Sequence, residues 1–327
     1  MGKCLVTGAA GFIGSHLTEE LVRKGYSVKA FVHYNSANFW GNLERLPGEI
    51  LKEIEIYSGD IRDYDSVSKA LTGCDRVFHL AALIGIPYSY VSPLAYIQTN
   101  VTGTYNILES ARIQALEDIL IPSTSETYGT AQYVPIDEDH PKVGQSPYSA
   151  TKIAADQLAA SYFYSFGLPV KIVRPFNTYG PRQSARAIIP TIISQLLDPQ
   201  VGSVRLGNLF PTRDLTFVKD TVKGFLSIAA SKECTGQAVN VGMSEEISVQ
   251  DLAHMLMRLT RVEKPVETES RRERREGSEV ERLCCDNRKL VSLTGWHPDY
   301  TLETGLRETI DSVRDRLGSY KSNLYNI

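Results

Sequence analysis

Short apolar runs that alternate with amphipathic stretches are the feature that most constrains how this chain can fold. The runs read "KCLVTG", "SVKAFV", "IEIYSGD", "RVFHLAA", "DILIPSTSE" and "VKIVRPFNTYG", with turn residues after each. Between them, apolar residues recur at helical spacing, as at Ile13, Leu17 and Leu21. Apolar strands that alternate with helices form a parallel sheet covered on both faces. The sequence therefore predicts an α/β fold with a doubly wound parallel sheet.

The second half of the chain is less regular and predicts a smaller α/β lobe. We expect helices near 187–197 and 219–231 and a short strand at 204–206. A further helix begins at Ser248, a good N-cap residue, with Asp251 at its third position. We therefore expect one domain at 1–175 and a second lobe at 176–327, interleaved with the first.

Charge and cysteine content exclude several classes of function. The 327 residues have a formal net charge of -3, which does not favour nucleic acid or an anionic membrane as partner. The five cysteines lack zinc spacing, so we predict no metal site and reduced thiols. Cys284 and Cys285 are either a redox pair or small apolar residues of a strand, and we favour the strand. We see neither a signal peptide nor a membrane span and expect a cytoplasmic protein.

A glycine-rich turn follows the first predicted strand and opens a helix. Gly8, Gly11 and Gly14 lie in "VTGAAGFIGSHL" with G-x-x-G-x-x-G spacing. Glycines let the backbone approach a pyrophosphate, and the helix N-terminus presents free N–H groups to it. Because a strand precedes the motif and a helix follows it, the sequence predicts a Rossmann-type dinucleotide site.

Residues after the second and third predicted strands bear on the choice of cofactor. An acid for the adenosine ribose is expected about 20 residues past the glycines, but His33 and the polar residues after it stand there. No arginine is present to meet a 2′-phosphate, so NAD is favoured over NADP. Asp60 in "GDIRD" is placed to accept from the adenine amino group; the alternative is a cap on the next helix.

Tyr148 and Lys152 lie four residues apart in "SPYSATKIAADQL", on one face of a predicted helix. An ammonium close to a phenol favours the phenolate, so we expect a lowered pKa for Tyr148. Such a tyrosine removes a hydroxyl proton at neutral pH while NAD takes a hydride.

With these motifs in place, the chain resembles the extended short-chain dehydrogenase/reductases that act on nucleotide sugars. The matching segments include "TGAAGFIG", "GDIRD", "HLAA", "TNVTGT", "STSETYG", "SPYSATK", "RPFNTYGPRQ" and "TRDLTFVKD", in family order over nearly the whole chain. The resemblance implies a homodimer formed through helices at roughly 96–114 and 147–166, and a UDP- or GDP-linked sugar as substrate.

The resemblance also implies roles for individual residues. Thr124 would bind the sugar O4, Tyr148 would be the acid/base, and Lys152 would bind the nicotinamide ribose. Asn100 would support the active-site helix. The implied cofactor contacts are Gly8, Gly11, Phe12, Ile13, Gly14, His33, Asp60, Ile61, Leu80, Ala81, Ala82, Asn100, Tyr148 and Lys152. Residues implied on the diphosphate side of the substrate are Asn177, Arg182, Arg213 and, from the charge run "RRERR", Arg274. The alternatives are a turn residue for Asn177 and ion pairs for Arg182 and Arg213.

Glu126 separates the reactions that such an enzyme can perform after C4 is oxidised. A 4-epimerase needs no further acid/base group, whereas a 4,6-dehydratase needs a base at C5. In the 4,6-dehydratases the matching glutamate works at C5, and Glu126 stands at that position. Ser125 departs from their pattern, because the hexose enzymes have aspartate there as the acid for O6. Either Glu126 performs both tasks or the reaction is different.

Longer segments favour one subgroup. "ALIGIPYSYVSP", "GTAQYVPIDEDHP", "GQSPYSATKIAAD", "RPFNTYGPRQSARAIIPTII" and "GSEVERL" resemble the hexosamine 4,6-dehydratases of the legionaminic acid type, which act on an NDP-N-acetylglucosamine. This implies Glu126 as base and acid, with Ser125 as a positioning donor. The alternatives are an NDP-sugar 4-epimerase, a UDP-glucuronate decarboxylase, an NDP-hexosamine 5,6-dehydratase and, from another class, a non-enzymatic NAD(P)-binding regulator.

Overall fold

The computed structural model describes residues 2–273, 276–322 and 324–325. A seven-stranded parallel sheet forms its centre, with strands in the order β11-β6-β5-β4-β1-β2-β3. The strands are β1 (Lys3–Thr7), β2 (Ser27–His33), β3 (Ile54–Gly59), β4 (Arg76–His79), β5 (Asp118–Pro122), β6 (Val170–Pro175) and β11 (Ala238–Val241). The order reverses between β1 and β4, and in such sheets ligands bind at the carboxyl ends of the strands beside this point.

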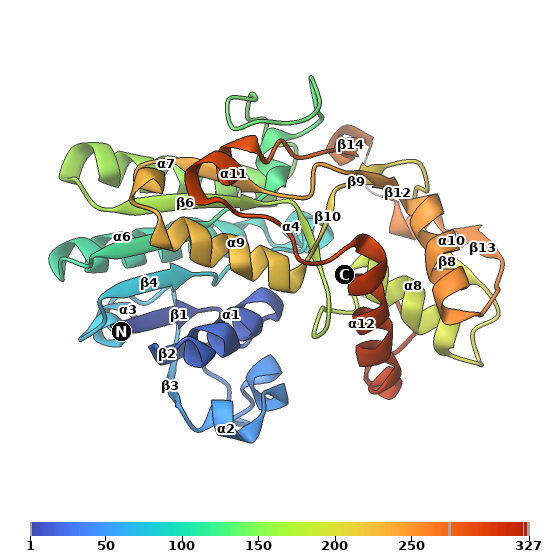
Figure 1. Ribbon diagram of the computed structural model, residues 1–327, viewed down its shortest axis with the longest axis horizontal. Helices are drawn as coiled ribbons and strands as arrows, with labels where there is room; N and C mark the ends of the chain where they lie inside the picture. The colour runs from blue at the N-terminus through green and yellow to red at the C-terminus, as the bar shows by residue number, and fades with distance from the viewer. Residues whose placement is uncertain (1, 274–275, 323, 326–327) are drawn as a thin grey trace.

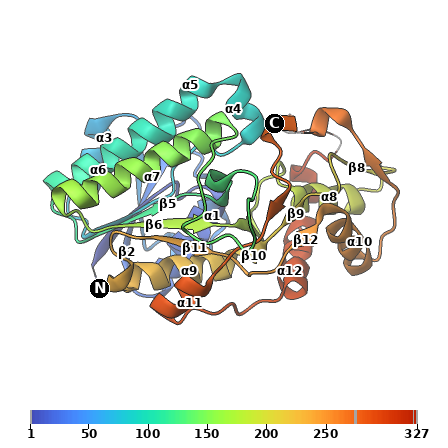
Figure 2. The same cartoon turned by 90° about the horizontal axis from the view of Figure 1, so that it is seen from above.

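Helices cover both faces of the sheet, as Figures 1 and 2 show. On one face pack α3 (Tyr64–Leu71), α6 (Gly103–Ile113) and α7 (Pro147–Phe166), and on the other α1 (Phe12–Arg23), α9 (Val218–Ala230) and α11 (Arg288–Thr294). The remaining helices near the sheet are α2 (Gly48–Leu51), α4 (Ile86–Val91) and α5 (Pro93–Tyr96). The doubly wound parallel sheet is therefore confirmed.

The six apolar runs of the sequence form the six strands β1 to β6. The seventh strand, β11, was not predicted, and with α9 it joins the large sheet from beyond residue 176. The large sheet therefore contains segments from both halves of the chain. The predicted N-cap is also present, since Ser248 Oγ accepts from the backbone N–H of Asp251 at 3.0 Å.

The second lobe has its own apolar core and short strands, at the right of Figure 1. Its helices are α8 (Ile188–Leu197), α10 (Val249–Thr260) and α12 (Leu302–Arg314). Its strands are β7 (Asn177–Tyr179), β8 (Val204–Leu206), β9 (Thr212–Arg213), β10 (Leu215–Phe217), β12 (Ile247–Ser248), β13 (Val266–Thr268) and β14 (Arg282–Leu283). Among the described residues, no helix is long and apolar enough to cross a bilayer.

Helix α7 has strong signals at both ends. Ser146 and Ser149 form a reciprocal capping box, Pro147 occupies the first helical position, and Gly167 ends the helix in the left-handed region at φ 67°. Residues at its two ends thus determine where this 20-residue helix begins and ends. Tyr148 and Lys152, four residues apart within it, therefore lie on one face of the helix.

Candidate active site

The glycine turn after β1 has no room for side chains. Gly8 has φ +67°, and a Cβ there would lie 2.8 Å from the backbone of Leu80 and Ala81. A Cβ on Gly14 would lie 2.1 Å from the carbonyl oxygen of Gly8. Gly11 is the N-cap of α1 and no side chain caps that end. The turn is therefore a backbone cradle at a helix N-terminus, a geometry that fits a pyrophosphate.

The other predicted cofactor contacts gather at the same edge of the sheet. Phe12 and Ile13 begin α1, His33 ends β2, Asp60 and Ile61 follow β3, and Leu80 to Ala82 follow β4. The loop after β4 is tied to β1, since Leu80 N donates to Thr7 O and Ala81 N donates to Thr7 Oγ1. The carboxyl ends of neighbouring parallel strands thus bring these residues together.

Asp60 does not cap the helix that follows it, so this alternative is wrong. Asp63 caps α3 instead, with its side chain accepting from Asp65 N. The Asp60 carboxylate faces the Arg62 guanidinium at 2.6–3.1 Å, and this hydrogen-bonded pair lowers the pKa of Asp60. Asp60 therefore stays ionised and able to accept a hydrogen bond.

Thr124, Glu126 and Tyr148 meet at the end of β5. Thr124 is the N-cap of a 3₁₀ turn, Ser125–Tyr128. Its Oγ1 accepts a hydrogen bond from the backbone N–H of Glu126 at 3.2 Å. Tyr148 is only 6% exposed, and its phenol is hydrogen-bonded to the Thr124 side chain. The Glu126 carboxylate lies close enough to act on the pKa of Tyr148. A hydroxyl, a phenol and a carboxylate therefore share one site.

The pKa of Tyr148 is raised, whereas the sequence predicts a lowered one. Burial raises the pKa of the phenol, Glu126 raises it further, and only the hydrogen bond with Thr124 lowers it. The expected lowering by Lys152 is absent, because Lys152 Nζ donates to the carbonyl oxygen of Pro122 at 2.6 Å. Burial also lowers the pKa of Lys152 to about 8. Tyr148 is thus the protonated phenol, a proton donor, in this state.

Asn100 links the loop after β4 to α7. It lies in a π-helical segment, Ile97–Thr102, and π-helical turns often occur at functional sites. Its Oδ1 accepts from Leu83 N at 2.8 Å, and its Nδ2 donates to Thr151 Oγ1 at 3.0 Å. Thr151 lies between Tyr148 and Lys152, so Asn100 contacts the segment of α7 that bears both.

The predicted substrate residues are not all brought together. Asn177 begins β7, and its Oδ1 is buried without a partner among the described residues. Arg213, on β9, pairs with Glu279 at 3.2 Å. Arg274 lies outside the described residues. Asn177 thus has an acceptor to offer a ligand, while Arg213 forms the ion pair given as its alternative.

Arg182 also forms the ion pair given as its alternative. Its guanidinium contacts Glu19 at 2.5 Å and Ser15 Oγ at 3.4 Å, both on α1. Because α1 covers the face of the sheet opposite α7, these contacts draw Arg182 away from the catalytic helix. The geometry favours a structural role in place of the predicted substrate contact.

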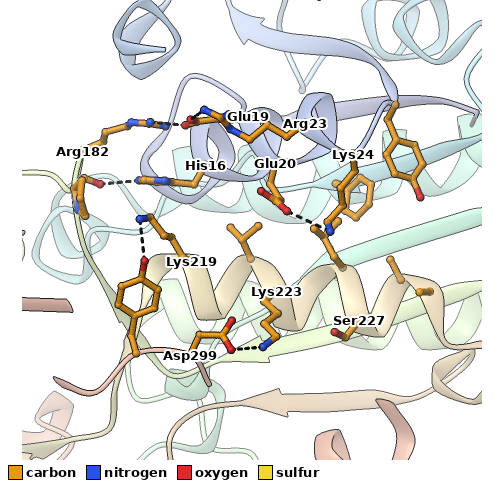
Figure 3. Close-up of a pocket in the computed structure, with 18 of the residues that line it drawn as sticks. His16, Glu19, Glu20, Arg23, Lys24, Arg182, Lys219, Lys223, Ser227 and Asp299 are labelled. Atoms are coloured by element: carbon orange, nitrogen blue, oxygen red, sulfur yellow. Dashed lines mark hydrogen bonds and ion pairs between the residues drawn. The ribbon is translucent and has the colours of Figure 1, made fainter. Parts of the chain in front are cut away.

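Figure 3 shows the cavity of about 1070 Å³ to which Arg182 belongs. It lies between α1 and α9, and the catalytic residues do not belong to its described lining. Most of its cations face acids within it. The pairs are Arg182–Glu19, Arg23–Glu19, Lys24–Glu20, Lys219–Glu308 and Lys223–Asp299. Internal pairing leaves this cavity without the chemistry of the candidate active site.

Sequence reasoning missed Arg186 and Tyr96. The Tyr96 ring lies 6.3 Å from the Tyr148 ring, edge to face, and its hydroxyl donates to Gly85 O at 2.5 Å. The Arg186 guanidinium lies against Gly85, where a Cβ would meet Nη1 at 2.4 Å, and it acts on the pKa of Tyr96. The lone cation in "SARAIIP" was the available signal. Arg186 places a positive charge close to Tyr96, whose ring contacts that of Tyr148.

Relatives of known activity match the chain over almost its whole length. Residues 5–309 match the family described as GDP-mannose 4,6 dehydratase. A UDP-N-acetyl-alpha-D-glucosaminuronate decarboxylase from Bacillus cytotoxicus is 33% identical over 324 residues, which cover 96% of this chain and 98% of that protein.

Two solved structures show the same fold. UDP-glucuronic acid 4-epimerase from Bacillus cereus, in complex with UDP-glucuronic acid and NAD, is 29% identical with a TM-score of 0.86, over 96% of this chain and 99% of that one. A double mutant of DesIV, a dTDP-glucose 4,6-dehydratase from Streptomyces venezuelae with NAD bound, is 28% identical with a TM-score of 0.88, over 97% and 98%. The chain therefore belongs to the GDP-mannose 4,6 dehydratase family, within the extended short-chain dehydrogenase/reductases that act on nucleotide sugars.

Proposed function

We propose that this protein is an NAD-dependent nucleotide-sugar 4,6-dehydratase that acts on an NDP-linked N-acetylglucosamine. The observation that carries the proposal is the position of Glu126 beside Tyr148 and Thr124. Oxidation at C4 alone requires a hydroxyl and a tyrosine, so an additional carboxylate supports chemistry at C5. The resemblance of longer segments to hexosamine dehydratases supports the choice of sugar.

The fit of NAD rests on the backbone cradle at Gly8 and Gly14. When bound there, NAD would supply the hydride acceptor for C4 and the hydride donor for C6. Lys152 would bind the nicotinamide ribose of NAD, and Asn100 would support α7. The same site binds the nucleotide sugar so that O4 faces Thr124 and Tyr148.

The residues of the chain then move the protons. Tyr148 exchanges the O4 proton, and Thr124 holds O4 by a hydrogen bond. The C4 ketone acidifies the C5 proton, which Glu126 removes. Glu126 passes that proton to O6, which leaves as water, while Ser125 positions O6. As C6 receives the hydride, C5 takes up one proton from solvent, which balances the proton that Tyr148 removes from O4. C4 is oxidised and C6 is reduced, so the net change is the loss of one water.

A second candidate is decarboxylation of an NDP-linked hexuronic acid, and Arg186 favours it. A guanidinium beside Gly85 and Tyr96 suits a carboxylate at C6 of the sugar. The relative from Bacillus cytotoxicus is described as a decarboxylase of a glucosaminuronate. Both candidates use Thr124 and Tyr148 for oxidation at C4. The dehydratase then loses water from C6, whereas the decarboxylase loses carbon dioxide from C5.

Mass spectrometry of the product separates the candidates. Purified protein and NAD would be incubated in heavy water with UDP- and GDP-linked N-acetylglucosamine, glucose and glucuronate. Loss of one water with deuterium at C5 supports the 4,6-dehydratase, and an exocyclic alkene product indicates 5,6-dehydration. Loss of carbon dioxide supports the decarboxylase. A new stereoisomer of unchanged mass indicates a 4-epimerase, and Glu126 would then not be the C5 base.

We also propose that the protein is a homodimer. The faces of α4 to α7 expose large apolar side chains: Val91, Leu94, Ile97, Tyr105, Ile113, Tyr164 and Phe166, each at least 44% exposed. Five of them lie on the segments, roughly 96–114 and 147–166, that the family resemblance implies pair with a second copy, and Val91 and Leu94 lie just before the first segment. Adjacent exposed apolar side chains of this kind mark protein–protein contact.

A further inference from the structure

A buried ion pair lies behind the candidate active site. Asp156 on α7 accepts from Arg174 Nε on β6 at 3.1 Å, and both side chains are at most 3% exposed. Asp156 follows Lys152 by one helical turn on the same face of α7. The proposed mechanism gives neither residue of the pair a role.

Arg174 also holds the turn that bears the candidate base. Its Nη1 donates to the hydroxyl of Tyr128 at 3.0 Å, and its guanidinium stacks on the ring at 5.3 Å. Tyr128 is fully buried and is the last residue of the 3₁₀ turn that contains Glu126. The position of Glu126 thus depends on a residue anchored by the central sheet.

A second strand of the sheet completes the anchor. The hydroxyl of Tyr128 donates to Asn240 Oδ1 on β11 at 2.7 Å. Asn240 in turn donates from Nδ2 to Ile136 O at 3.1 Å. The hydroxyl therefore both donates and accepts, so two neighbouring strands hold it in one orientation.

We propose that the Asp156–Arg174 pair is a positioning unit that joins the two halves of the catalytic site. Through Tyr128 it places Glu126 on the 3₁₀ turn, and through α7 it places Tyr148 and Lys152. The inference rests on the proposed function, because it assigns Glu126 a step separate from oxidation at C4. Catalytic groups need such support, since a misplacement of about 1 Å costs roughly 10²-fold in rate.

The same pair also affects the pKa of Lys152, through the Asp156 carboxylate. Burial lowers the pKa of Lys152, and the Asp156 carboxylate opposes that effect. Other titratable groups around Lys152 are Tyr148 on α7 and His79 on β4, whose pKa burial lowers to about 3, so that it is neutral. Glu126 on the neighbouring turn acts on Tyr148. Asp156 is thus the group whose removal should shift the titration of Lys152.

The first test is Tyr128→Phe, which removes only the hydroxyl. Stopped-flow NADH absorbance and product formation would be followed together with the substrate identified by mass spectrometry. We expect water loss to slow by about 10- to 10²-fold, while oxidation at C4 changes less than about 3-fold, so that NADH accumulates. The control is Tyr133→Phe, whose hydroxyl donates to the exposed Asp137.

The second test is Asp156→Asn, with Asp156→Glu as the conservative variant. We expect the alkaline limit of kcat to move down by about one pH unit, and Asp156→Glu to restore it. Asp118→Asn is the matched control, because Asp118 also forms a buried ion pair, with Lys171 at 2.9 Å, but at the first residue of β5. That position is at the opposite end of the strand from Thr124.

The outcomes separate the inference from the proposed function. If no substrate in the panel produces NADH or product with the wild type, the proposed function fails. If the wild type turns over but Tyr128→Phe slows both steps equally, or neither, the positioning role is wrong. The positioning role is also wrong if Asp156→Asn and Asp118→Asn alter stability alike and leave the pH profile of kcat unmoved.

Discussion

Nδ2 of Asn100 donates a hydrogen bond to Oγ1 of Thr151 at 3.0 Å, which joins the π-helical segment to α7. The same amide also forms two hydrogen bonds with Leu83. Its Oδ1 accepts from the Leu83 N–H at 2.8 Å, and its Nδ2 donates to the Leu83 carbonyl oxygen at 3.0 Å. A single side chain, 1% exposed, therefore connects the loop after β4 with the helix that bears Tyr148 and Lys152.

Replacing the two partners separately should show how much of this link serves α7. Asn100→Ala leaves the N–H and carbonyl of Leu83 unpaired and removes the donor to Thr151, and we expect a loss of about 1–3 kcal/mol in the free energy of unfolding and a lower kcat. Thr151→Val keeps the Leu83 contacts and removes the bond from Asn100, together with the bond that Thr151 Oγ1 donates to Tyr148 O at 2.7 Å, and should cost less stability. Urea unfolding and steady-state kinetics measure both. Equal stability losses in the two variants would contradict the importance of the Leu83 contacts.

Tyr148→Phe should abolish most turnover without unfolding the protein. The variant keeps the buried ring but loses the group that exchanges the O4 proton, so we expect kcat to fall by about 10²- to 10⁴-fold. Product formation and thermal unfolding would be measured together. Tyr26→Phe, on the other face of the sheet, is the control. Retention of full activity by Tyr148→Phe would instead favour a non-enzymatic role.

Glu126→Gln should separate oxidation from elimination. The amide keeps the size of the side chain but cannot take the C5 proton, so C4 should still be oxidised while water loss stops. We expect NADH to accumulate in proportion to enzyme, without exchange of deuterium at C5. Near wild-type dehydration by Glu126→Gln would show that another group is the base.

His16 should make the protein less stable in mild acid. Burial lowers the pKa of His16 to about 4, well below its ordinary value, and its Nε2 lies 2.9 Å from Pro181 O. Because the folded state resists protonation, its contribution is present above the unfolded pKa and is lost as pH falls towards the folded one. Between about pH 7 and pH 5 this amounts to about 2 kcal/mol. Chemical unfolding at both pH values, with His16→Gln for comparison, measures it; an identical pH dependence in the two proteins would refute the assignment.

A charge on the exposed apolar face should prevent dimer formation. Leu94 is 62% exposed and Ile97 49%, so Leu94→Glu combined with Ile97→Glu should produce a monomer without disturbing the fold. Light scattering after size exclusion gives the mass. Phe210→Glu is the control, since Phe210 is 82% exposed in the second lobe. A wild-type protein that is already monomeric would exclude the homodimer.

Much of the fold and part of the site follow from local patterns in the sequence. The six apolar runs became β1 to β6 because strand period and turn residues are local properties. The glycine turn and the four-residue spacing of Tyr148 and Lys152 are local as well, and so is the cap at Ser248. Glu126 could be picked out because it follows Thr124 by two residues.

The tertiary structure decided which partner each side chain takes and how far it is buried from solvent. Arg182 pairs with Glu19, 163 residues away, and no spacing in the sequence indicates that contact. Tyr128 meets Arg174 and Asn240 only because β6 and β11 are neighbours in the sheet. The pKa of Tyr148 rises because the fold buries the phenol. Pairing and desolvation depend on residues far apart in the chain, so they appear only once the sheet has brought those residues together.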